Sequence, residues 1–296
     1  MERVTFAESL QRPNLDFVLP GLLAGTVGMI VGQGAIGKSY FALELGMSLV
    51  TGKPVAGGLW EAPKHGSCAI CFGEDPAVII RERKHWLMHY HGINNEGAAK
   101  IDDSLFTYSC VGDDMRIVEK TANGMVDGPF LQTIRNTAQG LRLLVLDPLL
   151  FLQGGEENDN NVAASLMQRL SAIARDTGCA IVVLHHVGKG GNQDGKEEWA
   201  SARGASAFTT SVRWQLNMRP PSKEEQAKYE IDAEMRRFWI RTAVVKSNYG
   251  DAGGEKWLRR RDGGVLNCEQ PASGCRPSEK RKAMTVDVSE VRDDDF

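Results

Sequence analysis

The sequence predicts an α/β fold with a mainly parallel central sheet that is flanked by helices and carries antiparallel strands on its C-terminal side. Two patterns predict this fold. Short apolar runs alternate with segments of helical periodicity over the first two thirds of the chain, as in parallel strands joined by helical crossovers. From Trp214 onward, strand-like segments follow one another with only Gly-rich turns between them, which favours antiparallel pairing.

The first predicted elements flank a glycine-rich loop. Residues 25–31 form a short apolar run bounded by glycines, which indicates a strand. After the loop, a helix is expected from Lys38 to about Thr51, with Gly52 as its stop. Its apolar stripe is formed by Phe41, Leu45, Ser48 and Leu49. We therefore expect an amphipathic helix directly after the loop.

The alternation continues through the middle of the chain. A second buried strand is expected at Ser67–Phe72, followed by a helix that Pro76 can start and Gly92 can end. Further strands and helices are expected at Leu105–Ser109, Phe130–Gln139, Leu141–Leu146, Val162–Thr177 and Ala180–His185. The helix at 162–177 has the clearest pattern, with Val162, Leu166, Leu170, Ile173 and Ala174 on one stripe and Asp159, Asn160 or Asn161 as its cap.

The last third of the chain closes the predicted domain. Strands are expected at Trp214–Met218, Phe238–Lys246, Lys256–Arg260 and Val265–Asn267. After about Cys268 the apolar periodicity fails, and the ending is rich in Pro, Ser and charged residues. We therefore expect one domain over residues 1–268 and a flexible charged tail over residues 269–296.

Composition excludes several classes of protein. No apolar run approaches the roughly 20 residues that a membrane span needs, and the first residues lack the apolar block of a signal peptide, so we expect a cytoplasmic protein without a membrane partner. The net charge of −3 argues against a surface built for indiscriminate nucleic-acid binding. A local basic channel is still open, because basic residues cluster at Arg236, Arg237, Arg241, Lys246, Lys256, Arg259, Arg260 and Arg261.

The six cysteines do not have the density of a disulfide scaffold. Cys68 and Cys71 have the spacing of a metal-binding pair, but within a strand their odd spacing sends the two side chains to opposite faces. We therefore expect buried free thiols at these two positions.

The glycine-rich loop has the pattern of a nucleotide phosphate-binding loop, or P-loop. Its glycines let backbone N–H groups turn toward the phosphates, Lys38 brings a positive charge, and Ser39 supplies a hydroxyl to Mg²⁺. The candidate nucleotide-binding residues are Gly32, Gly34, Ala35, Ile36, Gly37, Lys38, Ser39 and Tyr40. ATP and Mg²⁺ are the expected cofactors.

Two carboxylates follow predicted strands at the same edge of the sheet. Asp147 ends the apolar run 141–147, where a carboxylate partner of Mg²⁺ belongs, and its alternative role is to cap a helix before Pro148. Glu74 follows the strand Ser67–Phe72 and can orient and deprotonate an attacking water. The alternative for Glu74 is one half of a surface acid pair that caps the next helix.

Histidines and basic residues complete the candidate set. His186 ends a strand at the ligand edge and could contact the terminal phosphate or the attacking water, although an ordinary strand-end histidine fits the spacing equally. The loop 188–203, polar and lysine-bearing, could contact single-stranded DNA or be a plain surface loop. Arg203, Arg213 and Lys246 are candidates to reach the nucleotide of a neighbouring subunit, with ordinary surface cations as the alternative.

The order of these motifs resembles the RepA-type hexameric replicative helicases of broad-host-range plasmids, within the RecA-type P-loop ATPases. The likeness covers nearly the whole chain up to Leu266. It is carried by Asp16-Phe-Val-Leu-Pro20, the P-loop, Gly73-Glu-Asp-Pro76, Leu146-Asp147, Asp176-Thr-Gly-Cys179, Leu184-His-His186, Arg203-Gly204, Val212-Arg-Trp214, Val245-Lys-Ser-Asn-Tyr-Gly250 and Asp262-Gly-Gly-Val-Leu266.

The resemblance implies a six-membered ring with ATP sites between subunits and a central channel for single-stranded DNA. It implies Glu74 as the catalytic carboxylate, Asp147 as the magnesium partner, His186 as the γ-phosphate sensor and Arg213 as the arginine finger. Related ring helicases place a Lys-x-Arg pair on a late strand, whereas this chain has Lys246-Ser247-Asn248. The missing arginine favours Arg213 as the finger.

The expected function is therefore an ATP-dependent replicative DNA helicase in plasmid-type replication. The resemblance implies 5′-to-3′ movement, a homohexamer, and initiator and primase proteins of the same replication system as partners. One alternative is a RecA-like recombination or repair ATPase that forms filaments. Another is a nucleotide-gated DNA-binding or loading module without unwinding.

Overall fold

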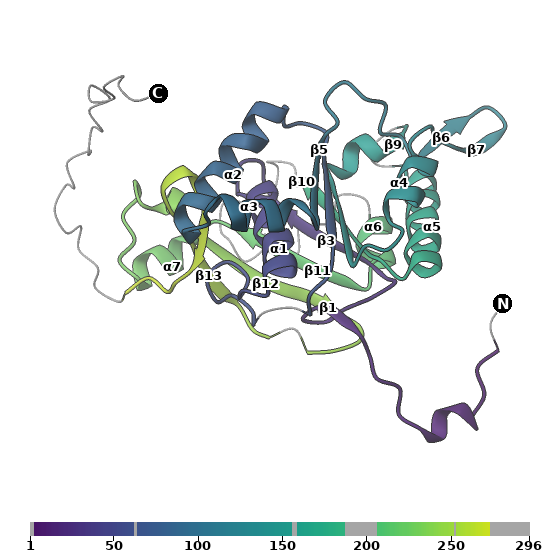
Figure 1. Cartoon of the computed structure of the whole chain (residues 1–296), viewed down its shortest axis with the longest axis horizontal. Helices are drawn as coiled ribbons and strands as arrows, with labels where there is room; N and C mark the ends of the chain where they lie inside the picture. Colours follow the sequence, from purple (N-terminus) through teal and green to yellow (C-terminus); the bar gives the residue numbers. More distant parts are fainter. Residues whose placement is uncertain (1–2, 62–63, 156–158, 187–205, 252, 273–296) are drawn as a thin grey trace.

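The central feature of the computed structural model is one large sheet with helices on both faces (Figure 1). The structure describes residues 3–61, 64–155, 159–186, 206–251 and 253–272. Over these residues the large sheet has nine strands, in the order β14-β13-β12-β11-β3-β10-β8-β4-β5. Its strands are β3 (Val27–Gly32), β4 (Cys68–Phe72), β5 (Leu105–Ser109), β8 (Leu143–Asp147), β10 (Ala180–His186), β11 (Trp214–Arg219), β12 (Trp239–Ser247), β13 (Lys256–Arg260) and β14 (Leu266–Cys268).

Helices cover the sheet, and two small sheets accompany it. The α-helices are α1 (Lys38–Thr51), α2 (Ala77–His91), α3 (Asn95–Asp102), α4 (Leu131–Thr137), α5 (Asn160–Thr177), α6 (Ser206–Ser211) and α7 (Lys223–Lys228). Short 3-10 turns are η1 (Glu8–Leu10), η2 (Leu149–Leu152), η3 (Arg236–Phe238) and η4 (Asp262–Gly264). The small sheets pair β1 (Phe17–Leu19) with β2 (Leu22–Leu23), and β6 (Val118–Thr121) with β7 (Gly124–Asp127) and β9 (Gln153–Gly154).

The mainly parallel sheet and its antiparallel side are as predicted. β10 pairs in parallel with β3 and β8, and β4 pairs in parallel with β8 and β5. β12, β13 and β14 then add in antiparallel order. The change of direction comes one strand later than the sequence pattern suggests, because β11 still runs parallel to β3. None of the described helices is long and apolar enough to cross a membrane.

Alternating strand residues build a separate apolar core on each face of the large sheet. One core contains Ile30, Ile70 and Val182 and packs against α1 and α2. The other contains Met29, Val183 and their neighbours and packs against α4 and α5. Cys68 belongs to the first core and Cys71 to the second, which confirms that these thiols point to opposite faces.

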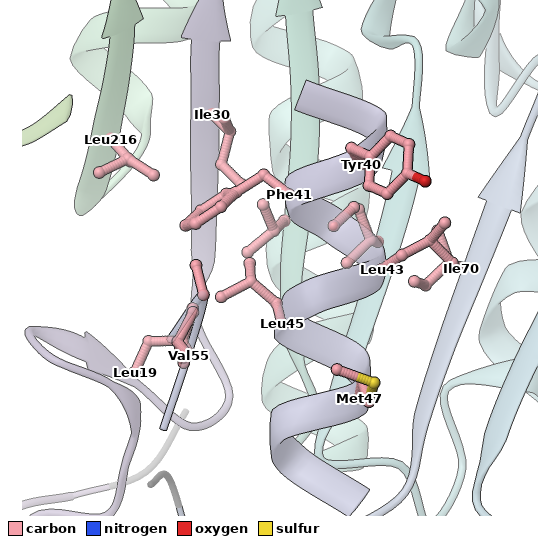
Figure 2. Close-up of a cluster of buried hydrophobic side chains, with 14 of the residues drawn as sticks. Leu19, Ile30, Tyr40, Phe41, Leu43, Leu45, Met47, Val55, Ile70 and Leu216 are labelled. Atoms are coloured by element: carbon pink, nitrogen blue, oxygen red, sulfur yellow. The ribbon is translucent and has the colours of Figure 1, made fainter. Parts of the chain in front are cut away.

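Helix α1 has the predicted bounds, but the prediction of an amphipathic helix is wrong. Nearly all of its residues from Lys38 to Leu49 are buried. Figure 2 shows Phe41 directed toward Ile30 of the sheet, with Leu43 on another side of the helix, near Ile70. The reason is that α1 lies on the sheet and is covered in turn by α2, α3 and β14, so no face is left for water.

The caps of the other long helices follow the sequence signals. Pro76 precedes α2, and Gly92 ends it in the left-handed conformation. On α5, Asp159 is the cap, and its carboxylate accepts hydrogen bonds from two backbone N–H groups. The helix α3 and the small sheet of β6, β7 and β9 were not predicted, because these elements are short and largely exposed.

Candidate nucleotide site

The P-loop connects β3 to α1 at the carboxyl edge of the sheet. Gly37 has φ +111°, a left-handed conformation that suits glycine, and it immediately precedes the first residue of α1. At Gly32 a Cβ atom would lie 2.6 Å from the backbone oxygen of Met218 on β11. Glycine is therefore needed at the start of the loop because a neighbouring strand passes close to it. Ile36, which is buried, packs beside the same glycine.

Lys38 is the central cation of the loop. Its Nζ donates to the carbonyl oxygens of Gly32 at 2.8 Å and Gln33 at 3.0 Å, and lies 3.1 Å from Nδ1 of His186. Burial lowers the pKa of Lys38 to about 8, against the opposing effect of Asp147 and Glu74. The ammonium is thus held in place by backbone oxygens and by a histidine at the end of β10.

His186 connects Lys38 to the predicted catalytic carboxylate. Burial, followed by the charge of Lys38, lowers the pKa of His186, so the ring is neutral at pH 7. A protonated Lys38 has only donors, so Nδ1 accepts and the ring proton is on Nε2. Nε2 lies 3.6 Å from Oε2 of Glu74. The ammonium of Lys38, the imidazole of His186 and the carboxylate of Glu74 therefore lie in a row, with the imidazole between the two charged groups and a gap wider than a hydrogen bond on the Glu74 side.

Ser39 and Asp147 form the second polar pair of the site. The hydroxyl of Ser39 donates to Oδ2 of Asp147 at 2.6 Å. Asp147 is 4 % exposed, and burial raises its pKa to about 6, opposed by the Ser39 hydrogen bond and by Lys38. Hydroxyl and carboxylate oxygens are ligands that suit Mg²⁺, which usually completes its shell with phosphate oxygens and water. The pair therefore fits a magnesium ion, which would neutralise phosphate charge.

The order of the strands explains why these side chains meet. In the sheet, β3, β10, β8 and β4 lie next to one another in parallel, so their carboxyl ends share one edge. Phe72 pairs with Asp147, which places Glu74 just beyond the same edge. The structure brings together the side chains of Lys38, Ser39, Glu74, Asp147 and His186 at this edge. A Cβ atom at Gly34 would lie 4.0 Å from Nδ1 of His186.

A cavity of about 290 Å³ opens in front of the loop. Predicted residues lining it are Ala35, Gly37, Lys38, Ser39, Tyr40, Glu74 and His186. Four further liners were not among the predicted site residues, namely Asp75, Arg83, Arg260 and Gly264. Arg260, from β13, donates from Nη2 to the carbonyl oxygen of Ala35 at 2.8 Å. The arginine run 259–261 was the only sequence signal for it.

Arg83 and Tyr40 form one side of the cavity. Arg83 pairs through Nη2 with Asp75 at 2.8 Å, and its guanidinium carbon lies 5.9 Å from the centre of the Tyr40 ring. The Tyr40 hydroxyl donates to the backbone oxygen of Arg83 at 3.3 Å. Burial raises the pKa of Tyr40 to about 12, so its hydroxyl stays protonated. No sequence motif indicated Arg83. Its place at the cavity depends on its ion pair with Asp75, which only the folded structure reveals.

Comparison with known proteins agrees with this geometry. A family model described as an AAA domain, AAA_25, matches residues 2–192, which is more than half of the chain. The chain belongs to the AAA_25 family. It is a P-loop ATPase of the RecA-like class. The crystal structure of the RadB recombinase has the same fold, with a TM-score of 0.51 and 14 % identity over 84 % of this chain and 93 % of that one.

In this AAA_25 chain, Arg213 and Lys246 lie at the opposite edge of the sheet from the P-loop. Arg213 is exposed just before β11, and its backbone N–H donates to Val27 at the start of β3. From Val27 to Gly32, β3 rises by five residues of about 3.3 Å each. The end of β3 beside Arg213 is therefore about 16 Å from the end that begins the P-loop. Neither cation therefore completes the nucleotide site of its own chain.

Lys246 is held by backbone oxygens near Arg213. Its Nζ donates to the carbonyl oxygen of Thr209 at 2.9 Å. Burial, followed by the charge of Arg213, lowers the pKa of Lys246. Arg203 and the loop 188–203 lie outside the described residues. Of the three candidate cations, the two that can be placed form one basic pair on the far edge of the AAA_25 domain.

Proposed function

We propose that this AAA_25 ATPase is a ring-forming replicative DNA helicase that hydrolyses ATP to move along single-stranded DNA in the 5′-to-3′ direction. The observation that carries the proposal is the row of side chains from Lys38 through His186 to Glu74. Lys38 holds phosphate, Glu74 orients the attacking water, and neutral His186 lies between the two groups. His186 is also the last residue of β10. Loss of the γ-phosphate would therefore change the contacts of the residue at which the chain leaves the sheet.

The position of Arg213 and Lys246 supports a site shared between subunits. A cation that offsets charge on the γ-phosphate has to come within contact distance of it. Both residues lie at the edge opposite the P-loop of their own chain. In a head-to-tail ring, that edge of one subunit can face the P-loop of the next. The ring, its hexameric size and the initiator and primase partners are expectations from the RepA resemblance.

Unwinding of a forked duplex tests the proposal directly. The full-length chain with ATP and Mg²⁺ is expected to release the labelled strand. The Lys38→Ala variant is expected to have neither unwinding nor hydrolysis, since the phosphate loses its central cation. If the chain hydrolyses ATP but unwinds neither a duplex with a 5′ single-stranded tail nor one with a 3′ tail, the helicase proposal is rejected. A nucleotide-gated loading module would then be favoured. Full turnover by Lys38→Ala would reject the site.

Mixing two inactive variants tests the shared site. Arg213→Ala chains keep an intact P-loop, and Lys38→Ala chains keep an intact Arg213. Mixed assemblies are expected to recover hydrolysis at those interfaces where the two intact halves meet. Arg175→Ala, in which an exposed arginine paired with Asp176 is removed, is the matched control and is expected to be active alone. Mixtures that assemble but recover no activity would reject a trans role for Arg213.

The likeness to a recombinase fold keeps a filament-forming DNA ATPase as the second candidate. Both candidates use the same nucleotide site, so the assembly distinguishes them. Electron microscopy with nucleotide and single-stranded DNA is expected to show closed rings. Open helical filaments would instead favour recombination or repair.

A further inference from the structure

The P-loop helix α1 carries a buried carboxylate that the nucleotide site does not use. Glu44 is fully buried, and neither of its carboxylate oxygens has a hydrogen-bond partner among the residues that the structure describes. Burial raises the pKa of Glu44, opposed by His91 and by the backbone of Leu266. A carboxylate that is kept out of water without close partners is costly, so its presence in the core calls for a role.

His91 provides the opposite charge. Its Nε2 lies 3.6 Å from Oε2 of Glu44, which is within the range of an ion pair but longer than a hydrogen bond. The same Nε2 is buried and has no hydrogen-bond partner in the described part of the chain. A protonated imidazole attracts a carboxylate more strongly where water is excluded. Because His91 is the last residue of α2, the pair holds the end of α2 against α1.

Tyr40 and Glu44 contact α2 at two points. They are four residues apart on α1 and therefore lie on the same side of that helix. The Tyr40 hydroxyl donates to the backbone oxygen of Arg83 at 3.3 Å, and Glu44 faces His91. Arg83 lines the nucleotide cavity and lies about 12 Å along α2 from His91. Since a helix moves nearly as a rigid body, a shift of α2 at His91 would displace Arg83.

A segment near the C-terminus completes the surroundings of Glu44. The strand β14 packs against α1, and the turn η4 packs against α2. At Gly264, in η4, a Cβ atom would lie 2.8 Å from Cε2 of Tyr40, and Gly264 also lines the nucleotide cavity. The backbone of Leu266, in β14, opposes the effect of burial on Glu44. Glu44 therefore lies where α1, α2 and the η4–β14 segment meet, and residues of all three line the cavity.

We propose that Glu44 and His91 are a positioning pair, which holds α2 on the P-loop helix and so sets where Arg83 and Gly264 close the nucleotide cavity. A buried ion pair contributes little to stability compared with apolar side chains of similar volume. Apolar contacts are non-directional and would let α2 slide on α1, whereas an ion pair fixes one helix relative to the other. The inference concerns nucleotide binding and does not depend on unwinding or on ring formation.

Titration of the full-length chain with a fluorescent ATP analogue and Mg²⁺, without DNA, tests the pair. Glu44→Met, which keeps the side-chain length, and His91→Gln are each expected to raise the Kd about tenfold, the effect of misplacing one charged contact at Arg83. The double variant is expected to have the same Kd as either single variant, because each already lacks the pair. His89→Gln changes an exposed histidine on the same helix and is the control, with the Kd of the parent expected.

Urea unfolding distinguishes a positioning role from a general loss of stability. Glu44→Met is expected to be at least as stable as the parent, because it removes a buried charge. Leu170→Ala, in the core on the opposite face of the sheet, is expected to lose stability and to keep the parental Kd. At saturating ATP, hydrolysis by Glu44→Met is expected to stay within about twofold of the parent rate, because the predicted catalytic groups are unchanged.

Removal of Arg83 tests whether the pair acts through this residue. In an Arg83→Gln chain, Glu44→Met is expected to change the Kd by less than about twofold, since the side chain that the pair positions is absent. The proposal would be overturned by a parental Kd for Glu44→Met, by an equal rise in Kd for Leu170→Ala, or by an undiminished effect in the Arg83→Gln chain. Failure to unwind DNA would reject the helicase and leave this result unchanged, because the titration contains no DNA.

Discussion

At the scale of single residues, burial pushes the three central groups of the site toward their neutral forms. It lowers the pKa of Lys38 to about 8, raises that of Asp147 to about 6 and lowers that of His186. Their charged forms are therefore costly in the free protein. A nucleotide phosphate and Mg²⁺ would supply the counter-charges. Part of the binding energy would therefore offset the desolvation cost of the buried charged groups.

Asp147→Asn is expected to stabilise the free protein while it abolishes hydrolysis. The folded-state pKa of Asp147, about 6, lies above its ordinary value, so the folded state binds the proton more tightly. The free energy of unfolding therefore falls as pH rises from about 4 to 6. Asparagine can still accept from Ser39 and removes that cost, so we expect a gain of about 1–2 kcal/mol at pH 7.

Urea unfolding at several pH values measures this effect. The gain of Asp147→Asn is expected to disappear at pH 4, where the wild-type carboxyl is protonated in the folded chain. A variant that is less stable than the wild type at pH 7, or a gain that is the same at pH 4, would contradict the role of burial at this residue.

Arg260→Gln is expected to weaken nucleotide binding about tenfold, which is the effect of one charge-assisted hydrogen bond. Arg260 lines the cavity, and its only described hydrogen bond goes to the carbonyl of Ala35, so the guanidinium has donors left for phosphate. Arg259→Gln is the matched control, because Arg259 pairs with Glu269 at 2.9 Å away from the cavity. Titration of a fluorescent ATP analogue measures both variants, and equal affinities would contradict the assignment.

At the scale of elements, the site exists because four parallel strands end side by side. β3, β10, β8 and β4 each deliver one part of it, namely the P-loop, His186, Asp147 and Glu74. The packing between β3 and β11 then fixes where the loop begins. Small changes in that packing should move the phosphate-binding backbone.

Gly32→Ala is expected to cost about 2 kcal/mol of stability and to weaken nucleotide binding. Its Cβ would lie 2.6 Å from the backbone oxygen of Met218, which the strand ladder holds in place. Gly34→Ala is the control within the same loop, because its Cβ would meet nothing closer than 4.0 Å. Urea unfolding is expected to give a lower free energy of unfolding for Gly32→Ala than for Gly34→Ala. Equal values would show that β11 can shift to accommodate the added methyl group.

At the scale of the whole molecule, the predicted site residues that the structure describes lie at two opposite edges of the sheet. The edge at the carboxyl ends of the parallel strands holds the nucleotide site, and the opposite edge holds Arg213 and Lys246. An assembly that brings these edges of different chains together would link hydrolysis in one subunit to movement in the next.

Single-stranded DNA is expected to stimulate hydrolysis in a salt-dependent way. Contacts to the DNA backbone release counterions, so the DNA concentration for half-maximal stimulation should rise about twentyfold between 50 and 200 mM salt for three phosphate contacts. An ATPase assay with oligonucleotide at several salt concentrations measures this. Stimulation that does not change with salt would count against a channel that follows the backbone.

The sequence by itself determined the local chemistry and most elements. The P-loop, the bounds of α1, and the carboxylates Glu74 and Asp147 at strand ends could all be predicted, because periodicity, caps and motif spacing are properties of neighbouring residues. The structure places these side chains together. Their catalytic roles are still predictions.

Only the tertiary structure decided which distant residues share the site. Arg260 contacts Ala35 across 225 residues of sequence, and Arg83 faces the cavity through Asp75 and Tyr40. The parallel direction of β11 and the burial of nearly all of α1 likewise depend on packing between separate segments. A local sequence pattern indicates whether a segment is a helix or a strand, but not which elements pack beside it. Strand order depends on the combined burial of surfaces that lie far apart in the chain.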